Sequence, residues 1–361
     1  MKRYYLGLNS DGPRAIRCLF CRGRSRDLRD LTQFLTGKYQ GATILTKNGR
    51  SALLIALKSY FEPGDKIIVN AFTCYAVYEA VKAAGMVPVF ADIDARNLNF
   101  NVDTLKKVCE GAKGIIVQNS LGNLVDMAEI EKFADKNGLL IIEDLAHVVE
   151  AKYPDGRKIG TVGAATAFSF GKDKAINAIS GGAVVLRTPV KHEIKAPLKI
   201  PKLSDHLRAR FYPFFCAMCR GLNHIRVGGV LMRVLIKIHW VEKSADNKLS
   251  SSRRLSKFQA RLALKKFKNP SSRLRDFYLV DNRKEVLSKL REAGYYFDGF
   301  WYEKPVSPER YYKKVKFPEE SCPVAVDVTK KIINFPTYYQ KSELKKAHEI
   351  IEPYLIGGKN G

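Results

Sequence analysis

The chain has few acidic residues for its length. Its 361 residues include 36 Asp and Glu against 62 Lys and Arg, which gives a formal net charge of +26. This excess favours an anionic partner, which means nucleic acid, a phosphorylated substrate or an acidic membrane surface. The sequence also lacks any run of about 18 uncharged apolar residues, and its N-terminal stretch has no apolar core of signal-peptide length. We therefore expect neither a membrane-spanning helix nor secretion.

Internal repeats and low-complexity segments are absent as well. Hydrophobic residues make up 46% of the chain and charged residues 27%, which is ordinary for a folded protein and excludes a wholly disordered chain, a collagen and a small disulfide scaffold. The seven cysteines are an odd number. Cys74 and Cys109 lie in apolar runs, as reduced buried thiols do. We expect a reducing, cytoplasmic location.

Residues 41–187 alternate short apolar runs with longer stretches of helical spacing, such as Tyr75–Ala84 and Met127–Asn137. The apolar runs are Lys66–Asn70, Val87–Asp92, Gly114–Asn119, Leu139–Asp144, Ala165–Phe170 and Gly182–Leu186. Alternation of this kind predicts an α/β fold with a mostly parallel sheet of about seven strands and helices on both faces. In such sheets ligands bind at the carboxyl ends of the strands.

The composition divides the chain into four parts. We predict an N-terminal arm at 1–40, a large α/β domain at 41–187, a basic and partly amphipathic insertion at 188–256, and a small C-terminal α+β domain at 257–361. Residues 187–275 contain 22 basic and 4 acidic residues. Their net charge of +18 is more than two thirds of the +26 of the whole chain. The C-terminal part has a strand-like segment at 277–282 and helical patterns at Arg283–Ala293 and Ser342–Tyr354.

Three groups at the strand ends suit one cofactor. A glycine turn before a helix, at Gly49, presents backbone N–H groups to a phosphate. Asp144 at a strand end can keep a heterocyclic nitrogen protonated by charge pairing. A buried lysine after the next strand, Lys172 or Lys174, can lose its proton and attack a carbonyl. Phosphate cradle, carboxylate and amine together are what pyridoxal phosphate requires.

Each of these residues also has an ordinary structural explanation. An aspartate that ends a strand commonly forms a salt bridge, and a lone loop lysine is normally solvated. His147 alone is more often a structural histidine than a catalyst. The spacing of Tyr75, taken alone, is more typical of a residue in the hydrophobic core than of one that stacks on a cofactor. Only the joint order of the motifs across successive strands favours a site.

The chain resembles the DegT/DnrJ/EryC1/StrS sugar aminotransferases, which are fold type I pyridoxal-phosphate enzymes with an aspartate-aminotransferase-like fold. Three segments carry the resemblance: residues 48–94 (from NGRSALL to FADID), 141–147 (IIEDLAH) and 168–182 (FSFGKDKAINAISGG). The similarity covers residues 30–187 well and residues 250–356 more weakly. Order, spacing and residue chemistry agree over all three segments.

The resemblance implies two catalytic residues. Lys174 lies four residues after Phe170, where the family has its Schiff-base lysine, whereas Lys172 falls two residues short of that position. Asp144 matches the carboxylate that pairs with the pyridine nitrogen. His147 matches the Gln or His near the phenolic oxygen of the cofactor. A related branch that dehydrates sugars has histidine in place of the lysine, so Lys174 favours transamination.

The resemblance also implies a set of phosphate ligands. Ser169, five residues before the lysine, and the turn Gly49-Arg50-Ser51 match the family's phosphate site. Arg50 stands where the family usually has Thr, and its side chain either adds a charge contact to the phosphate or points away. In the family a partner subunit contributes an asparagine to the phosphate, and Ser252 occupies that position here.

The aromatic ring that stacks on the cofactor in this family usually follows the position of Thr73, where this chain has Cys74. Either Tyr75 replaces the ring or a smaller group covers that face. The resemblance further implies a homodimer, an amino donor expected to be glutamate, and a nucleotide-linked keto-sugar as acceptor. The alternative is a non-catalytic or regulatory protein of the same fold.

Residues 207–240 place apolar clusters and basic residues at about helical intervals. We interpret the stretch as an arm that packs on a partner subunit, and the alternative is an interfacial helix pair docked on the inner face of an acidic membrane. No nucleic-acid binding is expected, because no zinc-finger or RRM signature is present. Two CxxC pairs, at Cys18–Cys21 and Cys216–Cys219, lie in helix-like apolar stretches, so we predict no metal site.

Overall fold

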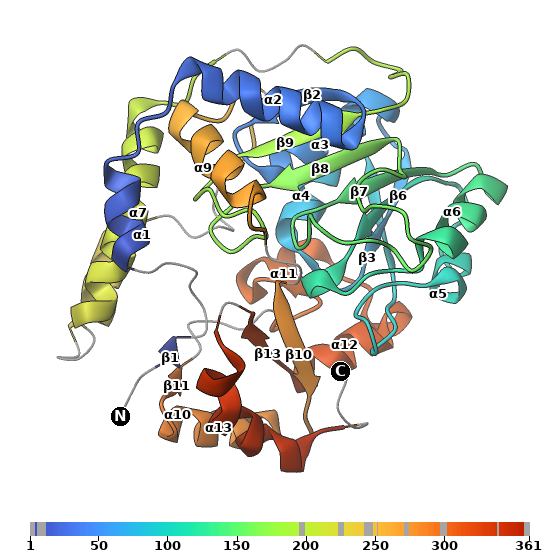
Figure 1. The fold of residues 1–361 in the computed structure, drawn as a ribbon. Coiled ribbons are helices and arrows are strands. Elements are labelled where there is room, and N and C mark those ends of the chain that lie inside the picture. The colour runs from blue at the N-terminus through green and yellow to red at the C-terminus, as the bar shows by residue number, and fades with distance from the viewer. Residues whose placement is uncertain are drawn as a thin grey trace.

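The computed structural model describes residues 4–5, 12–194, 199–222, 227–241, 248–250, 252–270, 274–296, 302–337 and 339–356. At its centre lies a seven-stranded sheet with the strand order β2-β9-β8-β7-β6-β3-β5 (Figure 1). The strands are β2 (Ala42–Thr46), β3 (Lys66–Asn70), β5 (Val87–Ala91), β6 (Ala112–Gln118), β7 (Leu140–Asp144), β8 (Ala165–Ser169) and β9 (Gly182–Leu186). Every neighbouring pair is parallel except the two pairs that contain β9. This confirms the predicted mostly parallel sheet.

Each of the six predicted apolar runs is a strand, with ends shifted by at most two residues. The sequence did not reveal β2, which lies at the edge of the sheet and pairs only with β9. Most of its side chains are partly exposed. An edge strand of this kind needs no continuous apolar run, so it left no clear pattern.

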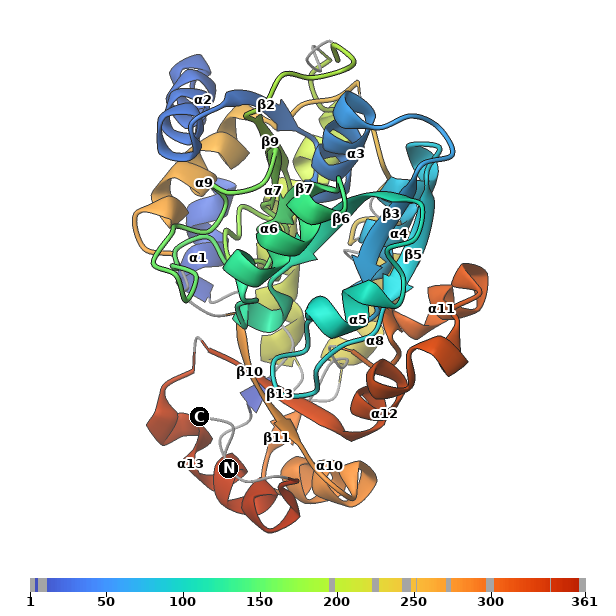
Figure 2. The same ribbon diagram turned by 90° about the vertical axis from the view of Figure 1, so that its right-hand side faces the viewer.

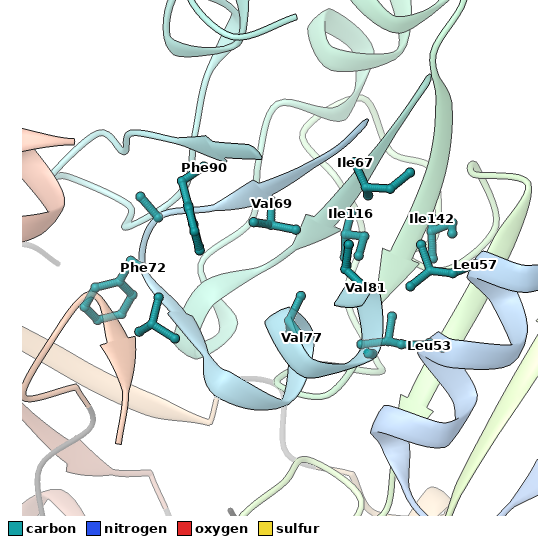
Figure 3. Close-up of a cluster of buried hydrophobic side chains, with 14 of the residues drawn as sticks. Leu53, Leu57, Ile67, Val69, Phe72, Val77, Val81, Phe90, Ile116 and Ile142 are labelled. Atoms are coloured by element: carbon teal, nitrogen blue, oxygen red, sulfur yellow. The ribbon is translucent and has the colours of Figure 1, made fainter. Parts of the chain in front are cut away.

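Helices cover both faces of the sheet. They are α2 (Ser25–Tyr39), α3 (Gly49–Tyr60), α4 (Tyr75–Ala83), α5 (Val102–Lys106) and α6 (Met127–Lys136), with a 3-10 turn η1 (Ser120–Gly122). Successive strand side chains point to opposite faces. Ile67 and Val69 of β3 therefore pack with Leu53 of α3 and Val77 of α4 (Figure 3), whereas Ile68 lies in a second core on the other face. Burial on both sides explains the apolar strands.

The C-terminal part lies below the sheet in the views of Figures 1 and 2. β10 (Arg275–Leu279) and β13 (Ile332–Pro336) form an antiparallel pair that shares a core with α10 (Arg283–Glu292) and α13 (Lys341–Ile351). The other helical elements here are α11 (Glu309–Val315), η4 (Glu319–Ser321), α12 (Pro323–Lys331) and η5 (Glu352–Tyr354). Two short strands, β11 (Tyr295–Tyr296) and β12 (Val306–Ser307), pair in parallel with β1 (Tyr4–Tyr5) and β4 (Thr73–Cys74) respectively.

Helix α9 (Lys257–Phe267) packs on α2. Its Ala260, Ala263 and Phe267 belong to the same buried cluster as Phe168 and other side chains of the central sheet. The sequence prediction placed this helix in the C-terminal domain at 257–361. We propose instead that α9 belongs with the sheet and that the C-terminal unit begins after Phe267.

A helical arm consists of α1 (Gly12–Leu19), α7 (Leu203–Leu222) and α8 (Gly228–Lys237). Figure 1 shows α1 and α7 side by side at one edge of the molecule. Cys18, Cys216 and Cys219 share the buried core of this arm, so folding brings the two CxxC pairs together. None of the seven cysteines, all of which lie among the described residues, forms a disulfide bond.

Among the residues that the structure describes, no three His, Cys, Asp or Glu side chains are grouped so as to hold a metal ion. No helix in the same residues is both long enough and apolar enough to cross a membrane.

Candidate active site

Asp144 is the last residue of β7 and is 6% exposed. Its Oδ1 accepts a hydrogen bond from the backbone N–H of Ala146 at 3.0 Å. Burial raises the pKa of Asp144, and the positive charge of Lys174 opposes that rise. Asp144 and Lys174 are therefore electrostatic neighbours at the carboxyl end of the sheet, as the motif order predicts.

His147 connects this strand end to Lys174. Its Nδ1 accepts from the backbone N–H of Leu121 at 3.1 Å, and its Nε2 lies 3.2 Å from Lys174 Nζ. Because Nδ1 is an acceptor, the hydrogen of the neutral ring lies on Nε2. Such a ring can donate to the Lys174 amine when that amine is neutral, which is the form that attacks a carbonyl. Burial and the charges of Lys174 and Arg275 lower the pKa of His147 well below its usual value.

The loop after β8 holds Lys174 in this position. The backbone N–H of Ala175 donates to the carbonyl of Ala146 at 3.3 Å, which ties the lysine loop to the loop after β7. Lys172 lies elsewhere, with its Nζ 3.6 Å from the ring centroid of Tyr212 in α7. Of the two candidate lysines, only Lys174 contacts His147 in this structure.

A second buried carboxylate, Glu143, supports the same region from the opposite side of β7. It is fully buried and accepts hydrogen bonds from the Tyr153 hydroxyl and from the backbone N–H groups of Gly160, Val162 and Gly163. These bonds fix the long loop that follows Asp144 and His147. The sequence analysis did not single out Glu143.

The amino end of α3 meets the end of β8. A Cβ on Gly49 would lie 2.5 Å from the Cβ of Ser169, so only glycine allows this close approach. Asn48 caps the helix by accepting from the backbone N–H of Ser51 at 3.0 Å. The predicted phosphate residues Gly49 and Ser169 are thus adjacent, beside a helix terminus that attracts anions.

Three other predicted residues have partners within the protein. Arg50 is buried and its guanidinium pairs with Glu79 of α4 at 2.5 Å. The Ser51 hydroxyl donates to Asn48 Oδ1 at 2.7 Å and accepts from the backbone N–H of Ser250 at 3.0 Å. Ser252 is exposed, with its hydroxyl 3.4 Å from that of Ser250. The segment that carries Ser252 therefore lies beside α3 of the same chain.

Two tyrosines near these strand ends have aromatic partners. Tyr75 stacks on Tyr311 of α11, with ring centroids 4.3 Å apart and an angle of 8° between the planes. Tyr302 lies edge-on to Phe72 at 4.5 Å. Burial and the nearby ionisable groups of Cys74 and Asp144 raise the pKa of Tyr302 well above its usual value. Tyr302 is thus a buried aromatic side chain in the electrostatic neighbourhood of Asp144.

The sequence analysis missed two residues that the C-terminal part brings to this place, Tyr302 and Arg275. Arg275 is 4% exposed, and its positive charge acts on His147. Both residues lie more than 100 positions after Lys174, outside the three segments that carry the resemblance. No local pattern marks them, because their approach depends on how the C-terminal part packs.

The residues at these strand ends fit pyridoxal phosphate. The junction of α3 with Ser169 offers backbone N–H groups and a hydroxyl to a phosphate. Asp144 is a buried carboxylate of the kind that pairs with a protonated ring nitrogen. Lys174 offers an amine whose hydrogen-bond partner suits nucleophilic attack.

Comparison with known proteins agrees with this arrangement. The model of the DegT/DnrJ/EryC1/StrS aminotransferase family matches residues 29–352. A pleiotropic regulatory protein of Geobacillus stearothermophilus is 25% identical over 311 residues, which cover 84% of this chain and 82% of that protein. GDP-perosamine synthase of Vibrio cholerae is 31% identical over 163 residues, and this match covers only 45% of this chain and 43% of the synthase.

A solved structure confirms the fold over nearly the whole chain. Spr1654 of Streptococcus pneumoniae in its PLP form superimposes with a TM-score of 0.68 at 17% identity, covering 97% of this chain and 98% of Spr1654. The family match extends over most of the present sequence. The chain belongs to the DegT/DnrJ/EryC1/StrS aminotransferase family, whose fold is that of pyridoxal-phosphate-dependent enzymes.

Proposed function

We propose that this protein transfers an amino group from an amino acid, with glutamate as the preferred donor, to a nucleotide-linked keto-sugar. One observation carries the proposal: Lys174 Nζ lies 3.2 Å from His147 Nε2, in a site that also contains buried Asp144. The bound cofactor supplies an aldehyde that reacts with amines and a ring that withdraws electrons. The side chains of the protein perform every other part of the chemistry.

Each side chain has a distinct task. Asp144 holds a proton on the ring nitrogen by charge pairing, because a buried carboxylate gains most from a cationic partner. Lys174 Nζ takes a proton from the α-carbon of the donor. His147 orients that amine, since Leu121 fixes its Nδ1. Ser169 and the first turn of α3 bind the phosphate.

The proposed acceptor substrate rests on the name of a relative and on the net charge of the chain. The name of the Vibrio cholerae relative denotes synthesis of a GDP-linked amino sugar. A chain with a net charge of +26 attracts a diphosphate-linked substrate.

We propose a homodimer in which the helical arm, where Phe20 is 77% exposed, contacts the second copy. Cysteines without disulfide bonds fit the cytoplasmic location that we propose.

The test is an absorbance spectrum of the protein loaded with pyridoxal phosphate, before and after borohydride reduction, followed by peptide mapping. We expect the hydride-fixed label on the peptide that contains Lys174, because this amine has the partner that favours attack. We also expect glutamate to convert the spectrum of the unreduced protein. A label on any other lysine contradicts the assignment, and sedimentation of the same sample checks for a dimer.

A second candidate function has its own observation. Val230 and Val234 of α8 and Ile238, which directly follows the helix, form one row and are 51%, 48% and 54% exposed. Exposed Arg233 and Lys237 form the neighbouring row. An apolar row beside a basic row complements an anionic lipid surface. The apolar side chains would enter the boundary between headgroups and acyl chains, and the basic side chains would contact the headgroups. A regulatory protein docked in this way would bind cofactor but convert no amino donor.

Vesicle sedimentation tests this alternative. Wild-type protein should sediment with phosphatidylserine vesicles and not with phosphatidylcholine vesicles. The triple variant Val230→Ser, Val234→Ser, Ile238→Ser should bind at least about tenfold more weakly, because it loses apolar area that the lipid would bury. If the wild-type protein sediments with neither kind of vesicle, α8 does not dock on membranes. If the variant is instead monomeric, the row belongs to the dimer interface.

A further inference from the structure

A pocket of about 220 Å³ lies between the end of α2 and the loop that joins β7 to β8. Its walls are formed by Lys38 and Tyr39 of α2 and by loop residues between positions 149 and 161, none of which belongs to the cofactor site proposed above. The volume far exceeds the roughly 15 Å³ that one water needs, but it is below the roughly 300 Å³ at which sites for drug-sized ligands begin. The pocket therefore suits a ligand smaller than a nucleotide-linked sugar.

A short hairpin holds two lysines of the pocket wall side by side. Lys152 and Lys158 face each other in an antiparallel bridge. The backbone hydrogen bonds of the hairpin lie on either side of this pair, and facing side chains are closest in pairs of that kind. Like charges directly opposite each other in a sheet are destabilising. Within the part of the chain that the structure describes, neither lysine forms an ion pair that would offset this repulsion.

Lys38 faces the same pocket from α2. Its side chain is 23% exposed and its ammonium group pairs with Glu150. Burial and the positive charge of Lys158 nonetheless lower the pKa of Lys38, so the two ammonium groups repel each other across the pocket. The wall thus carries three positive charges, from Lys38, Lys152 and Lys158, against the one negative charge of Glu150. A bound anion would neutralise the remaining charge of +2.

We propose that this pocket binds the phosphate group of a small phosphorylated metabolite. A phosphate monoester carries a charge of about −1.5 to −2 at neutral pH, which matches the surplus of the pocket wall. Lysine binds phosphate as a compact point charge, whereas the planar fork of arginine adds two-point recognition of a carboxylate. The arginine of the hairpin, Arg157, is engaged with Glu131 and Asp155. Lysines therefore supply the positive charge of the wall, and this composition favours phosphate over carboxylate.

The rest of the wall has a place for carbon atoms. Tyr39, Val149 and Ile159 line the pocket and are themselves almost fully buried. The Tyr39 hydroxyl donates to the Val149 carbonyl at 3.1 Å, which joins α2 to the loop. A phosphate held by the lysines would leave the attached carbon skeleton against this apolar surface. The site therefore favours an organic phosphate over inorganic phosphate.

Calorimetry of glycerol 3-phosphate with the cofactor-loaded protein, freed of excess cofactor, tests the site. We expect saturable binding to the wild type at about 0.15 M salt, where exposed charges are largely screened. The double variant Lys152→Gln, Lys158→Gln should bind at least about tenfold more weakly, because it loses two charged contacts. The matched control is Lys345→Gln, Lys346→Gln, which removes the same charge from exposed positions of α13 and should bind as the wild type does.

Two further comparisons complete the test. Inorganic phosphate as the second probe separates the two sources of the group: weaker binding than glycerol 3-phosphate supports an organic ligand, and equal binding shows that the phosphate group alone is recognised. Lys158→Arg keeps the charge and should retain binding, which distinguishes lost charge from a disturbed hairpin. If the wild type binds neither probe, or if both double variants weaken binding equally, the proposal is wrong. Because binding is measured, the result does not depend on the proposed aminotransferase activity.

Discussion

Lys174→Ala should abolish amino transfer, with a loss of at least about 10³-fold in the rate of the first half-reaction. The variant lacks both the nucleophile that attaches the cofactor and the base that takes the α-proton. Borohydride should then fix no label on the chain. Cofactor binding through the phosphate need not disappear, because Gly49 and Ser169 are untouched.

Lys172→Ala is the matched control for this prediction. Both lysines lie in the same loop, but Lys172 Nζ lies over the ring of Tyr212, away from His147. Its removal should cost a cation–π contact worth about 1 kcal/mol in the free energy of unfolding. The half-reaction and the borohydride label should persist. If Lys172→Ala is inactive and Lys174→Ala is not, the assignment of the reactive lysine is wrong.

Asp144→Asn should lower the transfer rate by at least about 10²-fold, since a neutral amide cannot pair with a protonated ring nitrogen and the loss of a buried charge partner costs several kcal/mol. The same substitution should stabilise the cofactor-free protein at neutral pH. Burial raises the pKa of Asp144, so the ionised carboxylate is unfavourable in the empty fold. An amide carries no such charge.

The pH dependence gives the sign of this effect. Because the folded pKa of Asp144 exceeds its usual value of 3.8, the folded chain holds this proton more tightly than the unfolded chain. The associated stability is present below the unfolded pKa and is lost as pH rises through the folded pKa. The difference in unfolding free energy between Asp144→Asn and wild type should therefore grow in favour of the variant as pH rises.

The contribution of His147 to the unfolding free energy is common to the variant and the wild type, so it cancels in the difference between them. The lowered pKa of His147 makes stability fall as pH drops below about 6.5 in both proteins. Denaturant titrations of the cofactor-free chains across this range supply the measurement. Asp126→Asn is the control, because Asp126 is an exposed helix cap whose amide can still accept from the N–H of Glu129. A difference that is independent of pH would show that burial does not raise the pKa of Asp144.

The strand ends were the most predictable part of the site. Asp144, His147 and Ser169 lie on or directly after strands that are apolar because both faces of the sheet are buried. Parallel strands bring their carboxyl ends to one edge, so the order of the motifs along the chain was enough to gather these residues. The contact between Lys174 and His147 follows from the same rule.

Side-chain direction was less predictable. The sequence left open whether Arg50 would face a phosphate, and in the structure it pairs with Glu79 on the neighbouring helix. Tyr75 was a candidate to cover the cofactor, and no pattern in the sequence indicated that its ring would stack on Tyr311. Both partners lie in other elements, and helical spacing does not specify which neighbour a long side chain will choose.

The chain's own sequence therefore determined six of the seven strands and the three groups at the carboxyl ends of those strands, because periodicity and strand polarity are local properties. Only the tertiary structure decided that Arg275 and Tyr302 approach that edge and that Cys18 lies with Cys216. These contacts join residues far apart in the chain. They depend on how separate layers pack, and the free energy of that packing is spread over many side chains with no motif to mark it.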